Sequence, residues 1–282
     1  MSGREKLAGV MGWPTNQSLS PLLHNYWLRE HRIAGNYVAL PVRPEDFGKT
    51  VANLPAQGFV GVSVTVPHKE AAFALTSERD EDAQNTGAVN TLIFAPAGIK
   101  GLNTDVRGFA VNLAESLGPD AVREGTVTIL GAGGAARAVV LALARMGASH
   151  IRLLNRTRAR AEALRNQLGR FANVDVLDWD EAQKAFAGAK LLVNTTSLGM
   201  IGKSKLELSL DGLPKEAAVA DIVYNPLETE LLRQARARGH RAVDGLGMLM
   251  HQAVPAFAAW FGVTPKVTTD LRVRLTKALG DA

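Results

Sequence analysis

The sequence predicts an α/β protein of two domains, each built around a mostly parallel β-sheet. Short apolar runs alternate with helical patterns in two series, the first beginning at Leu7 and the second at Thr126. This alternation of strands and helices is typical of parallel sheets with helices packed on their faces. The chain has 282 residues, which is enough for two domains with substantial cores. A glycine-rich turn in the second series adds a functional expectation to this fold class.

The first series contains three predicted strands and two predicted helices. They are strands at 7–11, 37–40 and 58–65 and helices at 20–31 and 44–54. Ser20 followed by Pro21 is typical of a helix N-cap and first turn. Ser18 lies two residues before, so a helix N-terminus with two hydroxyls is expected, which also suits a bound carboxylate.

The second series predicts a doubly wound nucleotide-binding domain. Its expected strands lie at 126–130, 151–154, 174–177, 191–194, 218–221 and 242–244. A connecting helix is predicted at 106–117, and a long apolar helical stretch, 248–261, is expected to return to the first domain. The expected domains are therefore 1–105 plus 245–282 for the substrate and 106–244 for the nucleotide.

The turn Gly131–Ala136 follows the apolar run Val127–Leu130 directly and precedes an alanine-rich helix. Closely spaced glycines between a strand and a helix let backbone N–H groups approach a pyrophosphate at the helix N-terminus. Glycines after a strand can also simply form a tight turn. The order strand, loop, helix and strand favours the dinucleotide site.

The residues after the next strand favour NADP over NAD. An NAD site usually carries an acid about 20 residues after the glycine loop, for the ribose 2′-hydroxyl. Here no Asp or Glu occurs between Gly131 and Glu162, and the strand at 151–154 leads instead into Asn155–Arg160. The guanidiniums of Arg156 and Arg160 suit a 2′-phosphate. The alternative is that these arginines belong to a solvated helix face.

Composition excludes several classes of function. The net charge is only +5. Arginines cluster within 150–170 and within 233–241, and neither cluster is interleaved with the aromatic residues that a single-stranded nucleic-acid platform would use. The second cluster, around Arg233–Arg241, is expected to be a solvated face. No apolar stretch is long enough to cross a bilayer and the N-terminus lacks a secretory pattern, so a cytoplasmic protein is expected. There are no cysteines, and the histidines show no ligand spacing, so no metal is expected.

Polar residues follow the predicted strands of the first domain. Thr65 and Lys69 lie just beyond the buried part of the strand at 58–65, and Asn90 and Asp105 adjoin later apolar runs. In open α/β sheets the carboxyl ends of strands border the ligand crevice, so these residues are expected at the site and Lys69 is a candidate acid/base. Taken singly, Lys69 also fits a surface lysine that opens a helix, Asn90 a turn, and Asp105 an N-cap.

The chain resembles the shikimate dehydrogenase family over nearly its whole length. The matching motifs are Ser-Leu-Ser-Pro at 18–21, Val-Thr-Val-Pro-His-Lys at 64–69, Gly-Ala-Val-Asn-Thr at 87–91, Asn-Thr-Asp at 103–105, Gly-Ala-Gly-Gly-Ala at 131–135, Asn-Arg-Thr at 155–157, Asn-Thr-Thr-Ser-Leu-Gly-Met at 194–200, Asp-Ile-Val-Tyr-Asn-Pro at 221–226 and Gly-Leu-Gly-Met-Leu-Met-His-Gln-Ala at 245–253. The resemblance implies NADPH-dependent, reversible reduction of 3-dehydroshikimate to shikimate, a step toward aromatic amino acids. Its Rossmann-type domain would hold the NADP. Ala136 departs from the serine of many relatives, which removes one hydroxyl contact.

The resemblance also implies a role for each matching residue. Lys69 and Asp105 would be the catalytic pair. The residues implied for the substrate are Ser18, Ser20, Thr65, Lys69, Asn90, Asp105, Tyr224 and Gln252. Those implied for the cofactor are Gly131, Ala132, Gly133, Gly134, Ala135, Asn155, Arg156, Thr157, Arg160, Thr195, Ser197, Met200, Ile222, Gly245 and Met248.

Two other functions remain open at this point. One is a quinate/shikimate dehydrogenase of broader specificity, often NAD-dependent. The other, from a different class, is a catalytically silent NADP-binding regulatory protein. The only partners expected are the small-molecule substrate and cofactor, with no nucleic acid or membrane, and the chain is expected to be a monomer or a homodimer.

Overall fold

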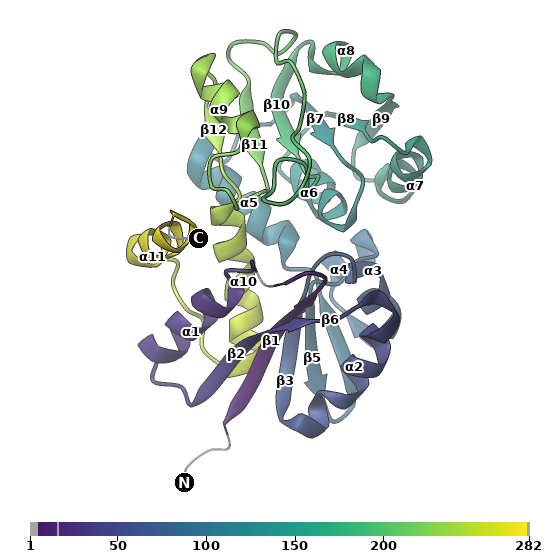
Figure 1. Ribbon diagram of the computed structural model, residues 1–282. Helices are drawn as coiled ribbons and strands as arrows, with labels where there is room; N and C mark the ends of the chain where they lie inside the picture. The colour runs from purple at the N-terminus through teal and green to yellow at the C-terminus, as the bar shows by residue number, and fades with distance from the viewer. Residues whose placement is uncertain (1–4, 16, 281–282) are drawn as a thin grey trace. The chain divides into compact units, whose positions relative to one another are not determined.

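The computed structural model describes residues 5–15 and 17–280, and it divides into two compact units (Figure 1). The first unit comprises the chain up to Thr104 together with the segment from Met250 onward, and the second unit is Asp105–Leu249. Helix α10 (Leu246–Phe261) therefore begins in the second unit and ends in the first. Within the described residues, no helix combines the length and the apolar character needed to span a membrane.

The first unit is built on a sheet of six strands in the order β2-β1-β3-β5-β6-β4. The strands are β1 (Lys6–Gly12), β2 (Gly35–Pro41), β3 (Phe59–Val64), β4 (Glu78–Arg79), β5 (Thr91–Ala95) and β6 (Gly98–Leu102). β1 runs parallel to β2 and β3, and β4 runs parallel to β6. β5 is antiparallel to both of its neighbours, β3 and β6. Its pairing with β6 follows from the connection, because only two residues join the two strands and a turn that short joins antiparallel strands. The sheet is thus mostly parallel, as expected, with one reversed strand.

Helices cover both faces of this sheet. They are α1 (Ser20–Glu30), α2 (Phe47–Asn53), α3 (Lys69–Leu75), α4 (Glu81–Thr86), α10 and α11 (Thr269–Gly280). Alternation along β3 separates the two faces, since Val62 and Val64 join the core with α2 while Gly61 lies against α10. A Cβ on Gly61 would lie 2.1 Å from Nε1 of Trp260, whose N–H donates to the Leu92 carbonyl at 3.0 Å. Only glycine lets α10 pack this closely on the sheet.

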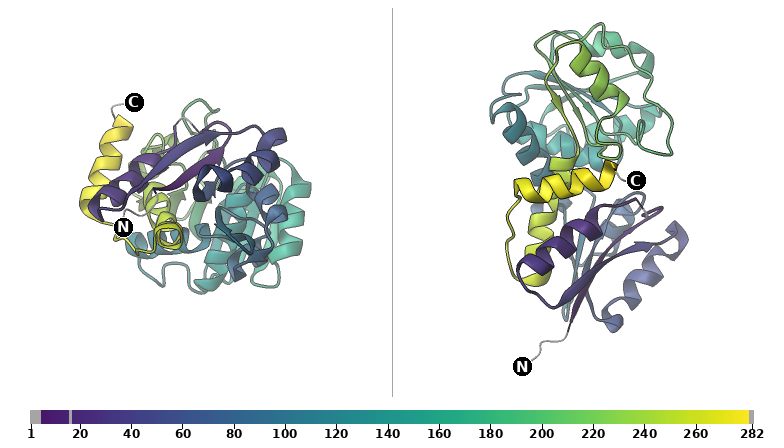
Figure 2. Two further views of the ribbon diagram at one scale, coloured as in Figure 1. Left: turned by 90° about the horizontal axis from the view of Figure 1, so that it is seen from below. Right: turned by 60° about the vertical axis from the view of Figure 1, so that its left-hand side comes forward.

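The C-terminal helices return to the first unit, as the sequence predicted. The indole N–H of Trp27 in α1 donates to the carbonyl of Lys266, at 3.2 Å, in the segment between α10 and α11. The Tyr26 hydroxyl donates to Asp270 at 3.2 Å, and Figure 2 shows α11 beside α1. The helix expected at 44–54 is a short 3-10 turn, Pro44–Asp46, followed by α2.

The second unit has a fully parallel sheet in the order β12-β11-β10-β7-β8-β9. Its strands are β7 (Thr126–Leu130), β8 (His150–Leu154), β9 (Asn173–Leu177), β10 (Ala189–Asn194), β11 (Ala218–Asp221) and β12 (Ala242–Val243). Its helices are α5 (Asp105–Leu117), α6 (Gly134–Arg145), α7 (Arg158–Leu168), α8 (Ala182–Phe186) and α9 (Glu230–Ala237). The predicted strands of this series are all present within a few residues of their expected ends.

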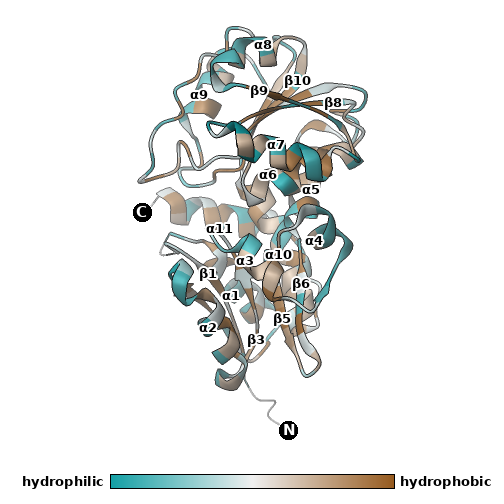
Figure 3. Cartoon of the chain, turned by 90° about the vertical axis from the view of Figure 1, so that its right-hand side faces the viewer, coloured by the Kyte–Doolittle hydropathy of each residue, from teal (hydrophilic) through white to brown (hydrophobic). Residues whose placement is uncertain are grey.

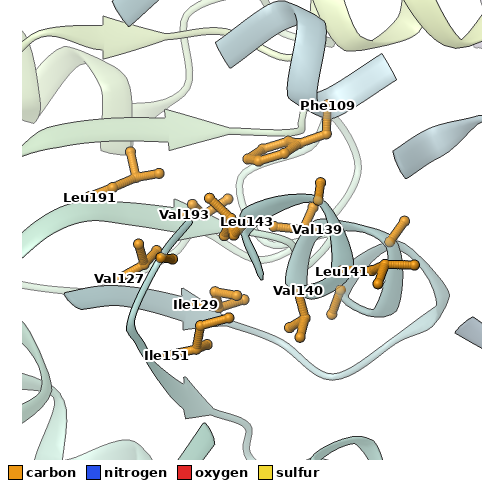
Figure 4. Packing of buried hydrophobic residues seen from close by; sticks show 14 of the residues in the cluster. Phe109, Val127, Ile129, Val139, Val140, Leu141, Leu143, Ile151, Leu191 and Val193 are labelled. Atoms are coloured by element: carbon orange, nitrogen blue, oxygen red, sulfur yellow. The ribbon is translucent and has the colours of Figure 1, made fainter. Parts of the chain in front are cut away.

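Both faces of the second sheet are buried. In Figure 4, Phe109 of α5 and Val139 of α6 lie with Val127 and Ile129 of β7 in one core cluster. On the opposite face the hydroxyl of Thr128 donates to a carbonyl of α8, and this face has its own apolar cluster. Figure 3 shows hydrophobic colour within this sheet and hydrophilic colour on the outer helices α7 and α8. Burial on both sides explains the nearly continuous apolar runs in the strands.

His24 is buried among aromatic side chains in the first unit. Its ring stacks on Tyr37 at 4.1 Å between centroids, with Trp27, Phe257 and Trp260 between 5.5 and 6 Å away. Neither ring nitrogen has a hydrogen-bond partner among the described residues, and burial lowers the pKa of His24 to about 3. The imidazole is therefore neutral at physiological pH.

This burial predicts an acid-dependent loss of stability. In the unfolded chain His24 takes up a proton below about pH 6.5, whereas the folded pKa is about 3. The folded state therefore loses stability as the pH falls through this range, by about 2 kcal/mol at pH 5. We expect His24→Leu to abolish this part of the pH dependence, measured as the free energy of urea unfolding at about pH 7.5 and pH 5. His31→Leu, at an exposed position, is the control, and equal pH dependence in wild type and His24→Leu would contradict the prediction.

Candidate functional site

The strand register of the second unit brings the expected cofactor residues to one edge of the sheet. Leu130 at the end of β7 pairs with Leu154 of β8 and with Asn194 of β10, and Asn194 pairs with Asp221 of β11. Because these strands are parallel, the chain leaves the sheet at the same edge after each of them. The residues that follow are Gly131, Asn155, Thr195 and Ile222. This is the edge where open α/β sheets bind ligands.

The two glycines of the expected pyrophosphate loop play different parts. Gly131 has φ +105°, and a Cβ there would lie 2.8 Å from Oγ1 of Thr195. Gly133 precedes α6 as its N-cap without a capping side chain, and a Cβ there would meet nothing within 4 Å. Gly131 is thus required by the packing of the protein itself, while Gly133 leaves open space over the N-terminus of α6. That space and the exposed amides suit a pyrophosphate.

The arginine cluster that follows β8 divides into paired and unpaired members. Arg158 pairs with Asp178 at 2.8 Å, Arg165 pairs with Glu162 at 2.7 Å, Arg152 donates to carbonyls around the end of α8, and Arg170 lies over the ring of Phe171. In the described part of the chain, Arg156 and Arg160 are the two members whose guanidiniums form no ion pair or hydrogen bond. Both are exposed. The solvated-face interpretation therefore fits Arg158 and Arg165, and the two remaining guanidiniums are available to an anion.

Asn155 shapes the turn that carries Arg156. Its Nδ2 donates to the carbonyl of Thr157 at 2.8 Å, and Thr157 is the N-cap of α7. The second arginine cluster, at the end of α9, is a solvated face as expected. Arg233 and Arg236 form exposed ion pairs with Glu230 and Glu228.

Asp221 is a buried carboxylate at the end of β11. Its Oδ1 accepts from Nδ2 of Asn194 and from the N–H of Val223, both at 3.0 Å, and its Oδ2 accepts from the hydroxyl of Thr229 at 2.8 Å. Only 2% of the residue is exposed, and burial raises the pKa of Asp221 to about 6, against the effect of its three donors. The carboxylate is therefore ionised at neutral pH without a cation beside it.

Gly245, at the start of α10, lies directly on the backbone after β11. A Cβ at this position would lie 2.2 Å from the carbonyl oxygen of Ile222 and 2.8 Å from that of Val223. Met248, one turn further along, is 7% exposed in the core of the second unit. Gly245 therefore belongs with Ile222 at the same edge of the sheet.

The first unit gathers its polar residues in a similar way at one edge of its sheet. The N–H of Val64, at the end of β3, donates to the carbonyl of Asn90 at 2.7 Å, and the N–H of Asn90 donates to the carbonyl of Leu102, at the end of β6, at 3.0 Å. Asn90 precedes β5 instead of following a strand. It nevertheless reaches this edge because β5 runs in the opposite direction.

Asn90 and Gln252 meet in a buried polar cluster. Nδ2 of Asn90 donates to Oγ1 of Thr104 at 2.9 Å and to Oε1 of Gln252 at 3.3 Å. Oδ1 of Asn90 accepts the N–H of Thr104 at 2.8 Å. Two residues that the resemblance assigns to the substrate, separated by 162 positions, thus lie in contact.

Lys69 is the first residue of α3 and is half-buried. The preceding His68 fixes the start of this helix, because Nε2 lies 2.7 Å from the carbonyl of Val42 and the ring stacks on Phe47 at 4.5 Å. The N–H of His68 donates to the carbonyl of Thr65 at 2.9 Å. Thr65 and Lys69 are therefore held on one short, well-anchored segment.

Two capping expectations are wrong. α1 begins at Ser20 itself, and its N-cap is Leu19, without a side-chain cap. The hydroxyl of Ser18 accepts the N–H of Ser20 at 3.3 Å, so Ser18 takes the local role expected of Ser20. Asp105 is the first residue of α5 and not the residue before it, and it is 5% exposed.

The comparison with known proteins agrees with the sequence resemblance. Residues 10–92 match the family described as shikimate dehydrogenase substrate binding domain, and residues 112–228 match shikimate / quinate 5-dehydrogenase. A protein named shikimate dehydrogenase (NADP(+)), from Paramagnetospirillum magneticum, is 50% identical over 96% of this chain and 98% of its own length. The chain belongs to the shikimate dehydrogenase family.

Solved structures of the family share the whole fold. Shikimate dehydrogenase from Thermus thermophilus, in complex with NADP(H) and shikimate, is 34% identical with a TM-score of 0.84, covering 98% of this chain and 100% of that one. Quinate dehydrogenase from Corynebacterium glutamicum, in complex with NAD, is 32% identical with a TM-score of 0.85, covering 99% of each chain. The two-domain architecture with a Rossmann-type unit is confirmed, whereas the fold alone does not distinguish shikimate from quinate.

Several residues that organise this family site were not singled out from the sequence. His68 anchors the segment that carries Lys69, and Thr104 is hydrogen-bonded to Asn90. Asp221 and Thr229 are hydrogen-bonded to each other and hold the loops after β10 and β11. Three of them lie inside the family motifs, so the motifs were the available signal. Their contacts depend on residues far away in the chain, which no local pattern predicts.

The two glycines of the loop give a matched pair of variants. Gly131→Ala should lower the melting temperature by several degrees, because it combines φ +105° with contact at 2.8 Å to Thr195. Gly133→Ala should leave the melting temperature unchanged, because its Cβ meets no protein atom. It should nevertheless weaken NADPH binding, measured by fluorescence titration, because the methyl group occupies the space open to the pyrophosphate. Unchanged NADPH affinity in Gly133→Ala would place the cofactor elsewhere.

Proposed function

We propose that this chain catalyses the NADPH-dependent, reversible reduction of 3-dehydroshikimate to shikimate. The supporting observation is that Arg156 and Arg160 stand unpaired beside a glycine loop in a chain 50% identical to NADP-dependent shikimate dehydrogenases. In this proposal 106–244 takes NADP, while 1–105 and 245–282 take the substrate. The proposed place of action is the cytoplasm, and the protein acts as a monomer or a homodimer.

The residues of the first unit suit a small polyhydroxylated acid. Ser18 and Ser20, at the start of α1, hold the substrate carboxylate, where the helix N-terminus favours an anion. Thr65, Asn90 and Gln252 bind the ring hydroxyls, and the family resemblance adds Tyr224, a residue of the second unit, to the substrate residues. A buried hydrogen-bonding site of this kind discriminates by leaving its own polar groups unpaired against the wrong analogue.

The chemistry needs one acid/base residue. Bound NADPH supplies the hydride, and Lys69 donates a proton to the carbonyl oxygen that becomes a hydroxyl. The family resemblance makes Asp105 the second catalytic residue, and we propose this role for it. In the direction of shikimate oxidation the same amine accepts the proton, and because this direction releases a proton overall it is favoured at alkaline pH.

The second candidate function is a dehydrogenase that accepts quinate as well. It stays open because a quinate dehydrogenase crystallised with NAD matches the chain as well as a shikimate dehydrogenase does, with TM-scores of 0.85 and 0.84. Steady-state rates with NADPH against NADH, and with shikimate against quinate, separate the two candidates. Absence of any turnover would instead favour a silent NADP-binding protein.

Arg156 carries the proposed choice of cofactor. We expect Arg156→Ala to raise the Kd for NADPH roughly 10-fold or more, because a charge-assisted contact to the 2′-phosphate is lost. The Kd for NADH, which lacks this phosphate, should stay nearly unchanged. Arg165→Ala is the matched control, because Arg165 already pairs with Glu162. Equal weakening of NADPH and NADH in Arg156→Ala would show that Arg156 does not contact the 2′-phosphate.

Lys69 carries the proposed proton transfer. Lys69→Ala should lower kcat by roughly 10²-fold or more while changing the KM for shikimate far less, because a general acid acts mainly in the transition state. Lys49→Ala, at an exposed position in α2, serves as control. A large rise in KM with kcat retained would make Lys69 a binding residue only.

A further inference from the structure

Asp221 connects to the loop that follows β10. Asn194, which donates to this carboxylate, also makes two hydrogen bonds to the loop. Its Oδ1 accepts the N–H of Thr196 at 3.0 Å, and its Nδ2 donates to the carbonyl of Leu198 at 3.3 Å. Nδ2 of the same amide also donates to Asp221 at 3.0 Å. The segment 195–198, which carries the proposed cofactor residues Thr195 and Ser197, is thus held by hydrogen bonds that converge on Asp221.

The loop after β11 is held from the same point. The N–H of Val223 donates to Oδ1 of Asp221 at 3.0 Å, and the N–H of Ile222 donates to the carbonyl of Asn194 at 3.1 Å. Val223 is buried, so its side chain points into the protein while its neighbours Ile222 and Tyr224 stay partly exposed. Gly245 packs on the carbonyls of Ile222 and Val223. A shift of the 222–224 backbone would therefore displace the start of α10 as well.

The third connection of the carboxylate is to α9. The hydroxyl of Thr229 donates to Oδ2 of Asp221 at 2.8 Å and accepts the N–H of Leu232 at 3.3 Å, so Asp221 also orients the N-cap of this helix. The groups that face the carboxyl are thus an amide from β10, a backbone N–H of its own loop and a hydroxyl from α9. None of them is charged or titrates near neutral pH.

Stability alone does not explain a carboxylate at this position. A buried charge without a cation is costly, and replacing such groups by neutral ones often leaves stability unchanged or raised. The carboxylate does, however, accept from three donors of separate segments at once, which no neutral side chain of this size does. Its geometry points to a role in placing the segments that carry the site.

We propose that Asp221 is a positioning residue of this dehydrogenase, which holds 195–198, 222–224 and the start of α10 in the arrangement required for hydride transfer. This inference rests on the proposed function. It assigns no contact between Asp221 and the substrate or cofactor. Its effect passes through Thr195, Ile222 and Gly245, whose backbones or side chains line the same edge of the sheet.

Asp221→Asn is the main test, on the full chain with shikimate and NADP⁺. Asn has one acceptor oxygen in place of two and presents an N–H₂ where the other oxygen was, so the donors from Asn194, Val223 and Thr229 can no longer all be accepted. We expect kcat to fall roughly 10- to 100-fold, as small misplacements in active sites do, with a smaller rise in the Kd for NADPH, since the displaced segments carry proposed cofactor residues. The melting temperature should be equal to that of the wild type or higher. Asp211→Asn, an exposed carboxylate paired with Arg238, is the matched control.

The pH profile gives a readout that a purely structural role would not move. Protonation of Asp221 removes an acceptor, so kcat for 3-dehydroshikimate reduction in the wild type should fall as the pH drops below about 6. In Asp221→Asn this acid limb should be absent at the reduced rate. Thr229→Ser should keep wild-type kcat, whereas Thr229→Val should lower it.

The outcomes separate this inference from the proposed function. A wild type without shikimate turnover would overturn the proposed function. A wild type that turns over, with Asp221→Asn equal to it in kcat and pH profile, would overturn the positioning role alone. A variant that loses melting temperature and NADPH affinity in step with kcat would also overturn it, because Asp221 would then serve folding only.

Discussion

Backbone hydrogen bonds between parallel strands fix where the proposed site of the second unit lies. The pairing of Leu130 with Leu154 and Asn194, and of Asn194 with Asp221, aligns four chain exits on one edge. A slip of one residue in any of these strands would turn its buried side chains toward the wrong face and shift the following loop. The close spacing of these exits also explains why glycine stands at 131 and 245. A side chain at 131 would contact Thr195, and one at 245 would contact the backbone of Ile222 and Val223.

The two units differ in how far their structure could be predicted from the sequence. The second unit follows one repeated pattern, strand, loop and helix, so its strands and the edge that carries Gly131 and Asn155 were predictable. The first unit contains the reversed strand β5, whose short apolar run gives no sign of direction. The N-cap of α1 was misplaced because Leu19, which has no capping side chain, holds this position between two serines that could each cap a helix.

The candidate site was predicted at the level of residues but not of contacts. The sequence showed an arginine-rich segment after β8, yet which guanidiniums remain unpaired depends on Asp178, which the fold brings back to Arg158. Likewise the contact between Asn90 and Gln252 joins the two separate chain segments that make up the first unit. Burial by residues from distant segments also shifts the pKa values of His24 and Asp221. The stabilising effect of neutral His24 is lost as the pH falls from about 6.5 toward 3, while burial of Asp221 stabilises below about 3.8 and loses this effect as the pH rises through about 6.

The open space at Gly133 has an evolutionary consequence. Because a side chain there meets no protein atom, folding does not require glycine at this position, whereas it does at Gly131. A descendant that no longer bound a dinucleotide would be free to accumulate alanine or serine at 133 while still retaining glycine at 131. The two positions therefore differ in what constrains them, the folded chain at 131 and the proposed ligand at 133.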